Sequence, residues 1–134
     1  MKTAKWIPFL FAAASLYDGV LGVMFLAAPL YLFELSKVTP PNHVGYLQFS
    51  AALLLVFSLM FIQIARSPIT NRQLIPYGIL LKVAYCGVAG GHWLAAGIPG
   101  MWKPFVVIDL VMGILFAWAY LILPHSAATT APRP

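Results

Sequence analysis

The segment formed by residues 74–97 most constrains the fold, because it is an apolar run that contains a lysine. It reads LIPYGILLKVAYCGVAGGHWLAAG and is long enough to cross a bilayer, which takes about 20 apolar residues. Lys82 lies near its middle and His92 near its end. A lysine in hydrocarbon costs about 2.5–3.5 kcal/mol even on insertion scales. We therefore expect the other helices to supply a partner for this ammonium group.

The composition predicts a single-domain, all-α integral membrane protein. Of the 134 residues, 62% are hydrophobic and 8% charged, and the mean hydropathy is +0.90. Soluble domains carry about 25% charged residues. The net charge of +5 does not indicate nucleic acid binding, because the eight Lys and Arg residues are scattered without a basic run. The single cysteine, Cys86, excludes an intrachain disulfide and is interpreted as a packing residue.

Four apolar segments predict a four-transmembrane-helix bundle within residues 1–123. The expected helices cover residues 6–33, 44–65, 74–96 and 105–123, and residues 124–134 are expected to form a disordered cytoplasmic tail. The start of the chain also resembles a signal peptide, with Lys2 and Lys5 before an apolar stretch and small residues. We favour an uncleaved helix, because the apolar sequence resumes after Asp18.

The distribution of basic residues predicts the orientation of the bundle. Four spans place both termini on one side. The side with the termini has five basic residues, namely Lys2, Lys5, Arg66, Arg72 and Arg133. The other side has two, Lys37 and Lys103. The positive-inside rule then predicts that both termini are cytoplasmic.

Two segments of the chain are similar to each other. Residues 17–28 read YDGVLGVMFLAA and residues 85–96 read YCGVAGGHWLAA, with seven of twelve positions identical. A tandem two-helix repeat would explain this similarity, and it would relate the two halves by a pseudo-twofold axis along the membrane normal. Chance similarity between helices built from few residue types is the alternative. The glycines of these segments and the pair Gly87 and Gly91 are expected to let helices approach closely.

The polar residues within the spans predict a buried site. From a rise of 1.5 Å per residue, Asp18 and Lys82 lie at depths that allow an ion pair. The same estimate predicts a polar pocket in the outer half, formed by Gln48, His92 and Asp109, with the other polar residues deeper. The candidate ligand-binding residues are Asp18, Gln48, Lys82, Tyr85, His92 and Asp109, with Tyr17 beside them. Ionisable groups inside a membrane indicate a ligand site, a proton relay or a substrate path, or they neutralise one another and fix helix register.

Several cofactor chemistries are poorly supported by the sequence. Haem needs two axial ligands, and His92 is the only histidine within a span, so that a methionine such as Met24 or Met112 would have to be the second. No three-residue set with known zinc spacing occurs, and no metal site is predicted. Nucleophile-elbow, phosphate-loop and dinucleotide-binding motifs are also lacking from the sequence. Catalytic residues and a cofactor are therefore not assigned.

The layout of the chain resembles the DoxX-like bacterial membrane proteins. The resemblance consists of four spans with short loops, a glycine-rich first helix ending at AAPLYLFEL, and the small size. It implies a bacterial inner-membrane protein, in some cases related to subunits of quinone-linked or redox-associated membrane complexes. Members often carry an arginine early in the first helix and a His-Gly pair after it. Lys5-Trp6 and Glu34-Leu35 stand at those places here, so no functional residue is carried over.

Three functional hypotheses follow from the sequence. The first is a binding protein or accessory subunit whose pocket holds a small lipophilic molecule, a lipid or a quinone. The second is a membrane enzyme that uses Asp109, His92 or Lys82 in acid–base chemistry. The third is a transporter of protons or small solutes, which at this size would require a homo-oligomer. A partner within a membrane complex would also be compatible with the first hypothesis.

Overall fold

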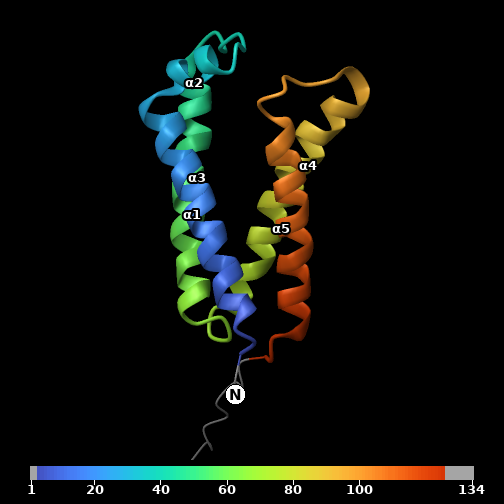
Figure 1. Cartoon of the computed structure of the whole chain (residues 1–134). Helices are drawn as coiled ribbons and strands as arrows, with labels where there is room; N and C mark the ends of the chain where they lie inside the picture. The colour runs from blue at the N-terminus through green and yellow to red at the C-terminus, as the bar shows by residue number, and fades with distance from the viewer. Residues whose placement is uncertain (1–2, 126–134) are drawn as a thin grey trace, which may run out of the picture.

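The computed structural model describes residues 3–125 as a helical bundle (Figure 1). Four of its helices are long and apolar enough to cross a membrane. The elements in chain order are α1 (Trp6–Ala27), α2 (Pro29–Leu35), α3 (Val44–Arg66), the 3₁₀ turn η1 (Arg72–Leu74), α4 (Ile75–Ala96) and α5 (Lys103–Ile122). Three of the expected helices match α3, α4 and α5 to within two residues at each end.

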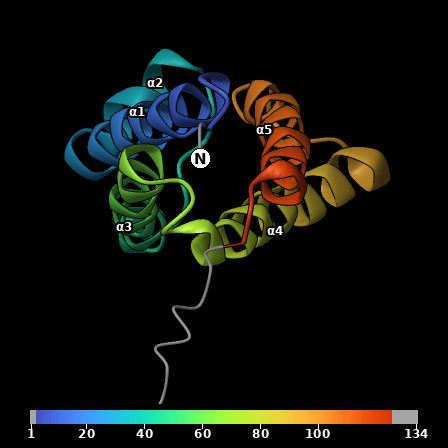
Figure 2. The same ribbon diagram turned by 90° about the horizontal axis from the view of Figure 1, so that it is seen from below.

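The four long helices form two antiparallel hairpins. Helix α1 packs mainly against α3, and α4 packs mainly against α5. Figure 2 shows the order around the bundle, in which α1 lies between α3 and α5. The hairpins meet at the end that contains the start of α1 and the end of α5, and they diverge toward the other end (Figure 1). We call the first end the closed half and the second end the open half.

The expected first helix, residues 6–33, is divided in the structure. Helix α1 ends at Ala27, and Pro29 begins the separate helix α2 after a non-helical Ala28 with φ −139° and ψ 53°. Proline disfavours the helical conformation in the residue before it and cannot donate the next helical hydrogen bond. The prediction of one continuous span was therefore wrong at this end. Helix α2 instead lies across the end of α3 in the open half (Figure 1).

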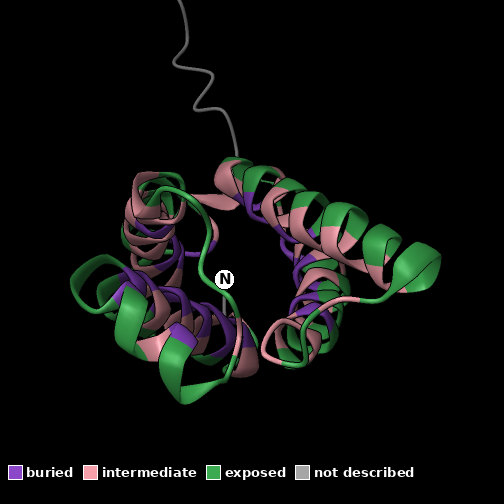
Figure 3. Cartoon of the chain, turned by 90° about the horizontal axis from the view of Figure 1, so that it is seen from above, coloured by how far each residue is buried: buried purple, intermediate pink, exposed green. Residues whose placement is uncertain are grey.

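The closed half contains the main core of the bundle. Phe116 lies 4.7 Å from Phe11 and 5.2 Å from Phe61 between ring centroids, and all three side chains are fully buried. The buried residues face inward and the outer faces of the helices are exposed, as Figure 3 shows. Such an arrangement, with large apolar side chains outside and close packing inside, suits a lipid solvent.

Arg72 fixes the end of α5 to the start of α4. Its guanidinium donates hydrogen bonds to the backbone oxygens of Tyr120, at 2.8 and 3.1 Å, and Leu123, at 3.1 Å. It also lies 3.9 Å from the centre of the Tyr120 ring. The last carbonyl groups of a helix have no partner within the helix, and a cation near them is favourable. Residues 126–134, most of the predicted tail, lie outside the described part of the chain.

Candidate functional site

Lys82 is the centre of a buried ionic cluster that joins three helices. Its ammonium donates to both carboxylate oxygens of Asp18 on α1, at 3.1 and 3.3 Å, and to Oδ1 of Asp109 on α5, at 3.1 Å. Exposed fractions are 2% for Lys82, 1% for Asp18 and 7% for Asp109. All of these contacts of the ammonium group are to the two carboxyl groups. We call these residues the Asp–Lys–Asp cluster.

The predicted ion pair between Asp18 and Lys82 is confirmed, whereas the predicted partner of Asp109 was wrong. Asp109 pairs with Lys82 and makes no salt bridge to His92. The reason lies one helical turn along α5, at Gly113. A Cβ added to Gly113 would lie 3.3 Å from the Cβ of Lys82, so the lysine stem passes closely over this glycine. The ammonium then reaches the residue four positions earlier, which is Asp109.

Two aromatic rings cover the cluster. The ammonium nitrogen of Lys82 lies 5.3 Å from the Tyr17 ring centre and 5.7 Å from the Phe61 ring centre, distances at which cation–π attraction operates. The Tyr17 hydroxyl is fully buried and has no hydrogen-bond partner among the described residues. The side chain of Tyr17, beside the cluster, therefore has a buried hydroxyl group without a hydrogen bond, which is uncommon in folded proteins.

The predicted outer pocket of Gln48, His92 and Asp109 does not form. Gln48 donates a hydrogen bond to the backbone oxygen of Leu26, at 3.1 Å, near the end of α1. His92 is exposed at the end of α4, where it borders a separate cavity. The sequence predicted a similar depth in the membrane for these residues, but it did not determine on which side of each helix the side chain lies. Of the candidate residues, Asp18, Lys82 and Asp109 form the Asp–Lys–Asp cluster, whereas Tyr85 and His92 line the cavity.

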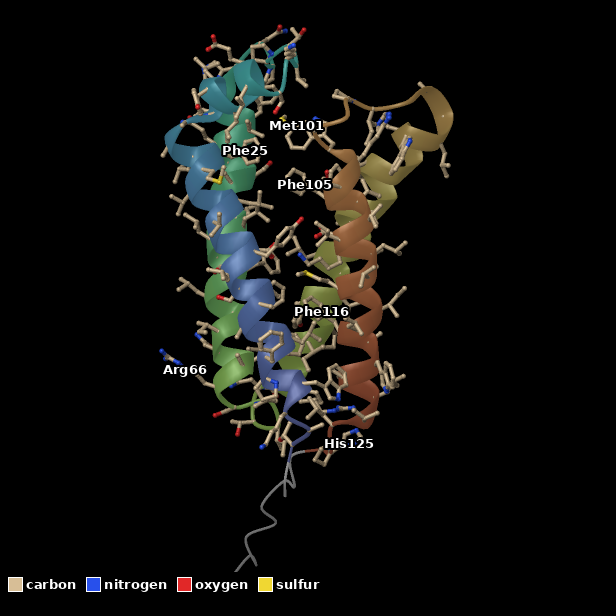
Figure 4. The ribbon with its side chains drawn as sticks, viewed as in Figure 1. Phe25, Arg66, Met101, Phe105, Phe116 and His125 are labelled. Atoms are coloured by element: carbon tan, nitrogen blue, oxygen red, sulfur yellow. The ribbon has the colours of Figure 1, made fainter. Side chains whose placement is uncertain are left out.

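This cavity of about 540 Å³ lies between the hairpins in the open half. Leu21 and Phe25 come from α1, Leu54 from α3, and Tyr85 and His92 from α4. The hydroxyl of Tyr85 donates a hydrogen bond to the backbone oxygen of Trp102, at 3.2 Å. The aromatic ring of Tyr85, rather than its hydroxyl, therefore lines the cavity. The side-chain view shows Phe25, Met101 and Phe105 around the gap between the hairpins, above Phe116 of the closed half (Figure 4).

The two edges of the cavity differ. Aromatic contacts bridge α1 and the start of α5, with 5.6 Å between Phe25 and Trp102 and 6.3 Å between Tyr17 and Phe105. Phe33 of α2 also contacts Trp102, at 6.0 Å. The opposite edge, between α3 and α4, is lined by small or aliphatic side chains, several of them exposed, such as Ser50, Leu53 and Ala84. The cavity is therefore closed toward α5 and open between α3 and α4.

The aromatic bridge at Trp102 was not predicted from the sequence. One signal for it was present, because Trp102 and Phe105 are three residues apart at the start of a helix and so share a face. Cys86 is half-buried, and its sulfur approaches the backbone oxygen of Val106 at 3.5 Å, in line with a packing role.

Metal binding has no support from the geometry of the described residues, among which no three His, Cys, Asp or Glu side chains come together as a set of ligands. The arrangement can do two things chemically. The cavity can take an apolar molecule, and the Asp–Lys–Asp cluster can hold charge or a proton. No protein-family model, curated protein or solved structure matches this chain at a significant level. The interpretation of the site therefore depends on its geometry alone.

Proposed function

We propose that this protein crosses a membrane four times and binds a small lipophilic molecule in the cavity of the open half. Helices of 20–23 residues are about 30 Å long, which equals the thickness of the hydrocarbon core. Their outer faces expose large apolar side chains, including Phe9 at 76% and Leu121 at 77%. In water such surfaces would aggregate, whereas in lipid they are solvated.

The observation that carries the binding proposal is the cavity between the hairpins. Its volume of about 540 Å³ falls within the range of small-molecule sites, about 300–1,000 Å³. Its walls are almost entirely apolar, and its open edge between α3 and α4 would face the acyl chains of the bilayer. A lipophilic molecule such as a quinone or a single lipid chain could then enter sideways from the membrane. This geometry favours binding over the catalytic alternative, because no acid–base pair faces the cavity among the described residues.

The experiment fills the cavity and follows ligand binding in bilayer nanodiscs. Ala89 on α4 lines the cavity, and Ala89→Phe places a ring inside it. Ala95 on the same helix is exposed and does not line the cavity, so Ala95→Phe is the matched control. The signal is the fluorescence of Trp102 in a protein whose other tryptophans are replaced by phenylalanine, quenched by a short-chain benzoquinone or by a brominated fatty acid.

We expect saturable quenching of Trp102 that weakens at least tenfold in apparent affinity in Ala89→Phe and is unchanged in Ala95→Phe. The two quenchers distinguish a quinone site from a lipid site. Quenching that rises linearly with the quencher concentration, or that is equal in both variants, would show simple partitioning into the bilayer and contradict the proposal.

The orientation and the location are further parts of the proposal. The basic residues Lys5, Arg66 and Arg72 lie at the end of the closed half. Lys37 and Lys103 lie at the opposite end, in the open half. The positive-inside rule then supports a closed half that faces the cytoplasm. The bacterial inner membrane is proposed from the resemblance to DoxX-like proteins. Reporter fusions at the C-terminus and in the loop between α2 and α3 would test this, since they should report opposite sides.

A tandem repeat and a relationship to DoxX-like proteins also stay proposals. The order of the helices supports a repeat, because a half-turn of the bundle would exchange α1 with α4 and α3 with α5 (Figure 2). The equivalent glycines do not pack alike: a Cβ on Gly22 would lie 2.9 Å from the backbone oxygen of Ala51, whereas a Cβ on its equivalent, Gly90, would lie 3.8 Å from a side-chain carbon of Val106. The pair Gly87 and Gly91 has nothing within 4 Å. The expected close approach at the latter pair is thus not seen within the chain. A homologue with stronger similarity between its halves would decide the question.

A further inference from the structure

The Asp–Lys–Asp cluster has more negative than positive groups. Its two carboxyl groups share one ammonium group at 3.1 Å, so the fully ionised cluster would carry one net negative charge. Other elements do not supply a second cation: residues 44–65 of α3 carry no charged side chain, and α1 has no charged residue besides Asp18. Lys103, at the start of α5, lies 5.6 Å from the ring of Trp93 near the end of the bundle. Among residues 3–125, the other titratable groups near the cluster are Tyr17, Tyr85 and Cys86, which cannot offset a negative charge.

An excess charge in an apolar interior is very unfavourable, and two carboxylates in one site cannot both stay ionised cheaply. The simplest way to neutralise the cluster is to add one proton. A metal cation would need several additional oxygen ligands, and no such set occurs near the cluster in residues 3–125. We infer that the cluster is a proton-binding site, in which the carboxyl group of Asp109 carries one exchangeable proton at neutral pH. This inference is independent of the ligand proposed for the cavity.

The hydrogen bonds decide which carboxyl group holds the proton. Both oxygens of Asp18 accept from the ammonium group, at 3.1 and 3.3 Å, as expected for a carboxylate. Asp109 accepts only one such bond, through Oδ1. Its second oxygen accepts no hydrogen bond from the described residues, so this atom is free to carry the proton. The Tyr17 hydroxyl, which has no hydrogen-bond partner among the described residues, belongs to the side chain whose ring centre lies 5.3 Å from the Lys82 ammonium nitrogen.

The proton on Asp109 has a structural consequence for the contact between the hairpins. Asp109 and Lys82 border a second groove of about 230 Å³ between α4 and α5, so Asp109 is less enclosed than Asp18. Lys82 and Asp109 belong to one hairpin and Asp18 to the other. When Asp109 loses its proton, a second full carboxylate competes for the ammonium group that holds Asp18. The protonation state of Asp109 therefore sets the strength of the ionic tie between the hairpins.

The protein is well suited to a direct test, because Asp18 and Asp109 are its only aspartates. Selective ¹³C labelling of the aspartate carboxyl carbon gives one signal from each in solid-state NMR of the full chain in lipid bilayers. The chemical shift distinguishes a carboxylic acid from a carboxylate. In the wild-type protein at pH 7 we expect one signal of each kind. Asp109→Asn identifies the acid signal by its loss, and Asp18 then stays ionised.

The variants give a stoichiometric pattern. In Asp18→Asn, one carboxyl group faces one ammonium group, so we expect Asp109 to become ionised and the acid signal to vanish. In Lys82→Met, both carboxyl groups lose their cation and both should give acid signals. Two carboxylate signals in the wild-type protein at pH 7 would overturn the inference, and so would an acid signal that belongs to Asp18. The wild-type spectrum alone suffices for the first outcome if a variant fails to fold.

Discussion

The closed and open halves of the bundle differ in how closely the two hairpins pack against each other. In the closed half, helices from both hairpins bury Phe11, Phe61 and Phe116 against one another, and Arg72 caps the end of α5. In the open half, α1 still packs on α3 and α4 on α5, but the hairpins separate around a cavity of about 540 Å³. There, the rings of Phe25 and Phe33 contact Trp102 and connect the two hairpins.

This difference indicates a division of roles within a very small protein. The closed half supplies the packing that holds the hairpins together, and the open half contains the cavity that we propose as a binding site. The Asp–Lys–Asp cluster lies where the hairpins begin to diverge, and Asp18–Lys82 is the ion pair that connects them. Close packing in lipid brings no gain from removing water, so helix contacts depend on shape and on polar bonds. Substitutions in the two halves should therefore differ in their effect on stability.

The largest effect is expected at the junction between the halves. Lys82→Leu leaves two buried carboxyl groups without their cation and should lower the free energy of unfolding by about 3–5 kcal/mol. Val83→Leu, at an exposed position on the same helix, is the control. Unfolding in mixed micelles, followed by circular dichroism, measures the change.

Adding Asp18→Leu to Lys82→Leu should restore part of the lost stability, because it removes one unpaired carboxyl group. Recovery should be incomplete, since Asp109 is still without its cation. A double variant whose loss equals the sum of the two single losses would show that Asp18 and Lys82 do not interact.

A smaller effect is expected from truncating a leucine in each half. Leu10 is buried in the core of the closed half, and Leu10→Ala should cost about 2–3 kcal/mol, because it leaves a void that cannot close. Leu54 lines the cavity, where one side already lacks neighbours, so Leu54→Ala should cost less than about 1 kcal/mol. The same unfolding assay compares them. Equal losses would mean that the open half is packed as tightly as the closed half in the bilayer.

The smallest effect compares two glycines from the similar segments of α1 and α4. A Cβ on Gly22 would meet the backbone oxygen of Ala51 at 2.9 Å, so Gly22→Ala should push α1 from α3 and cost about 1 kcal/mol or more. Gly87 has nothing within 4 Å, and Gly87→Ala should be neutral or stabilise the helix by up to about 1 kcal/mol. A clear loss of stability at Gly87 would instead reveal a helix from another chain packed on this face.

Much of the architecture follows from the sequence. Apolar runs of about 20 residues determine four long helices, and short polar loops determine their antiparallel order. The buried lysine in one run also requires an acidic partner, and only two carboxyl groups lie within the spans, so the pairing of Lys82 with Asp18 was predictable. The break before Pro29 was visible in the sequence as well, but the apolar run on both sides of it concealed the end of α1.

The direction of each side chain around its helix was decided only by the tertiary structure. The depth of a residue along its helix can be counted from the sequence. The rotation of the helix about its axis depends on which neighbouring helices can approach it closely. Gly113 lets α4 come near α5 and so brings Lys82 to Asp109, while His92 and Gln48 turn elsewhere. The cavity has the same origin, because it results from the angle between two hairpins, which depends on contacts between residues far apart in the chain.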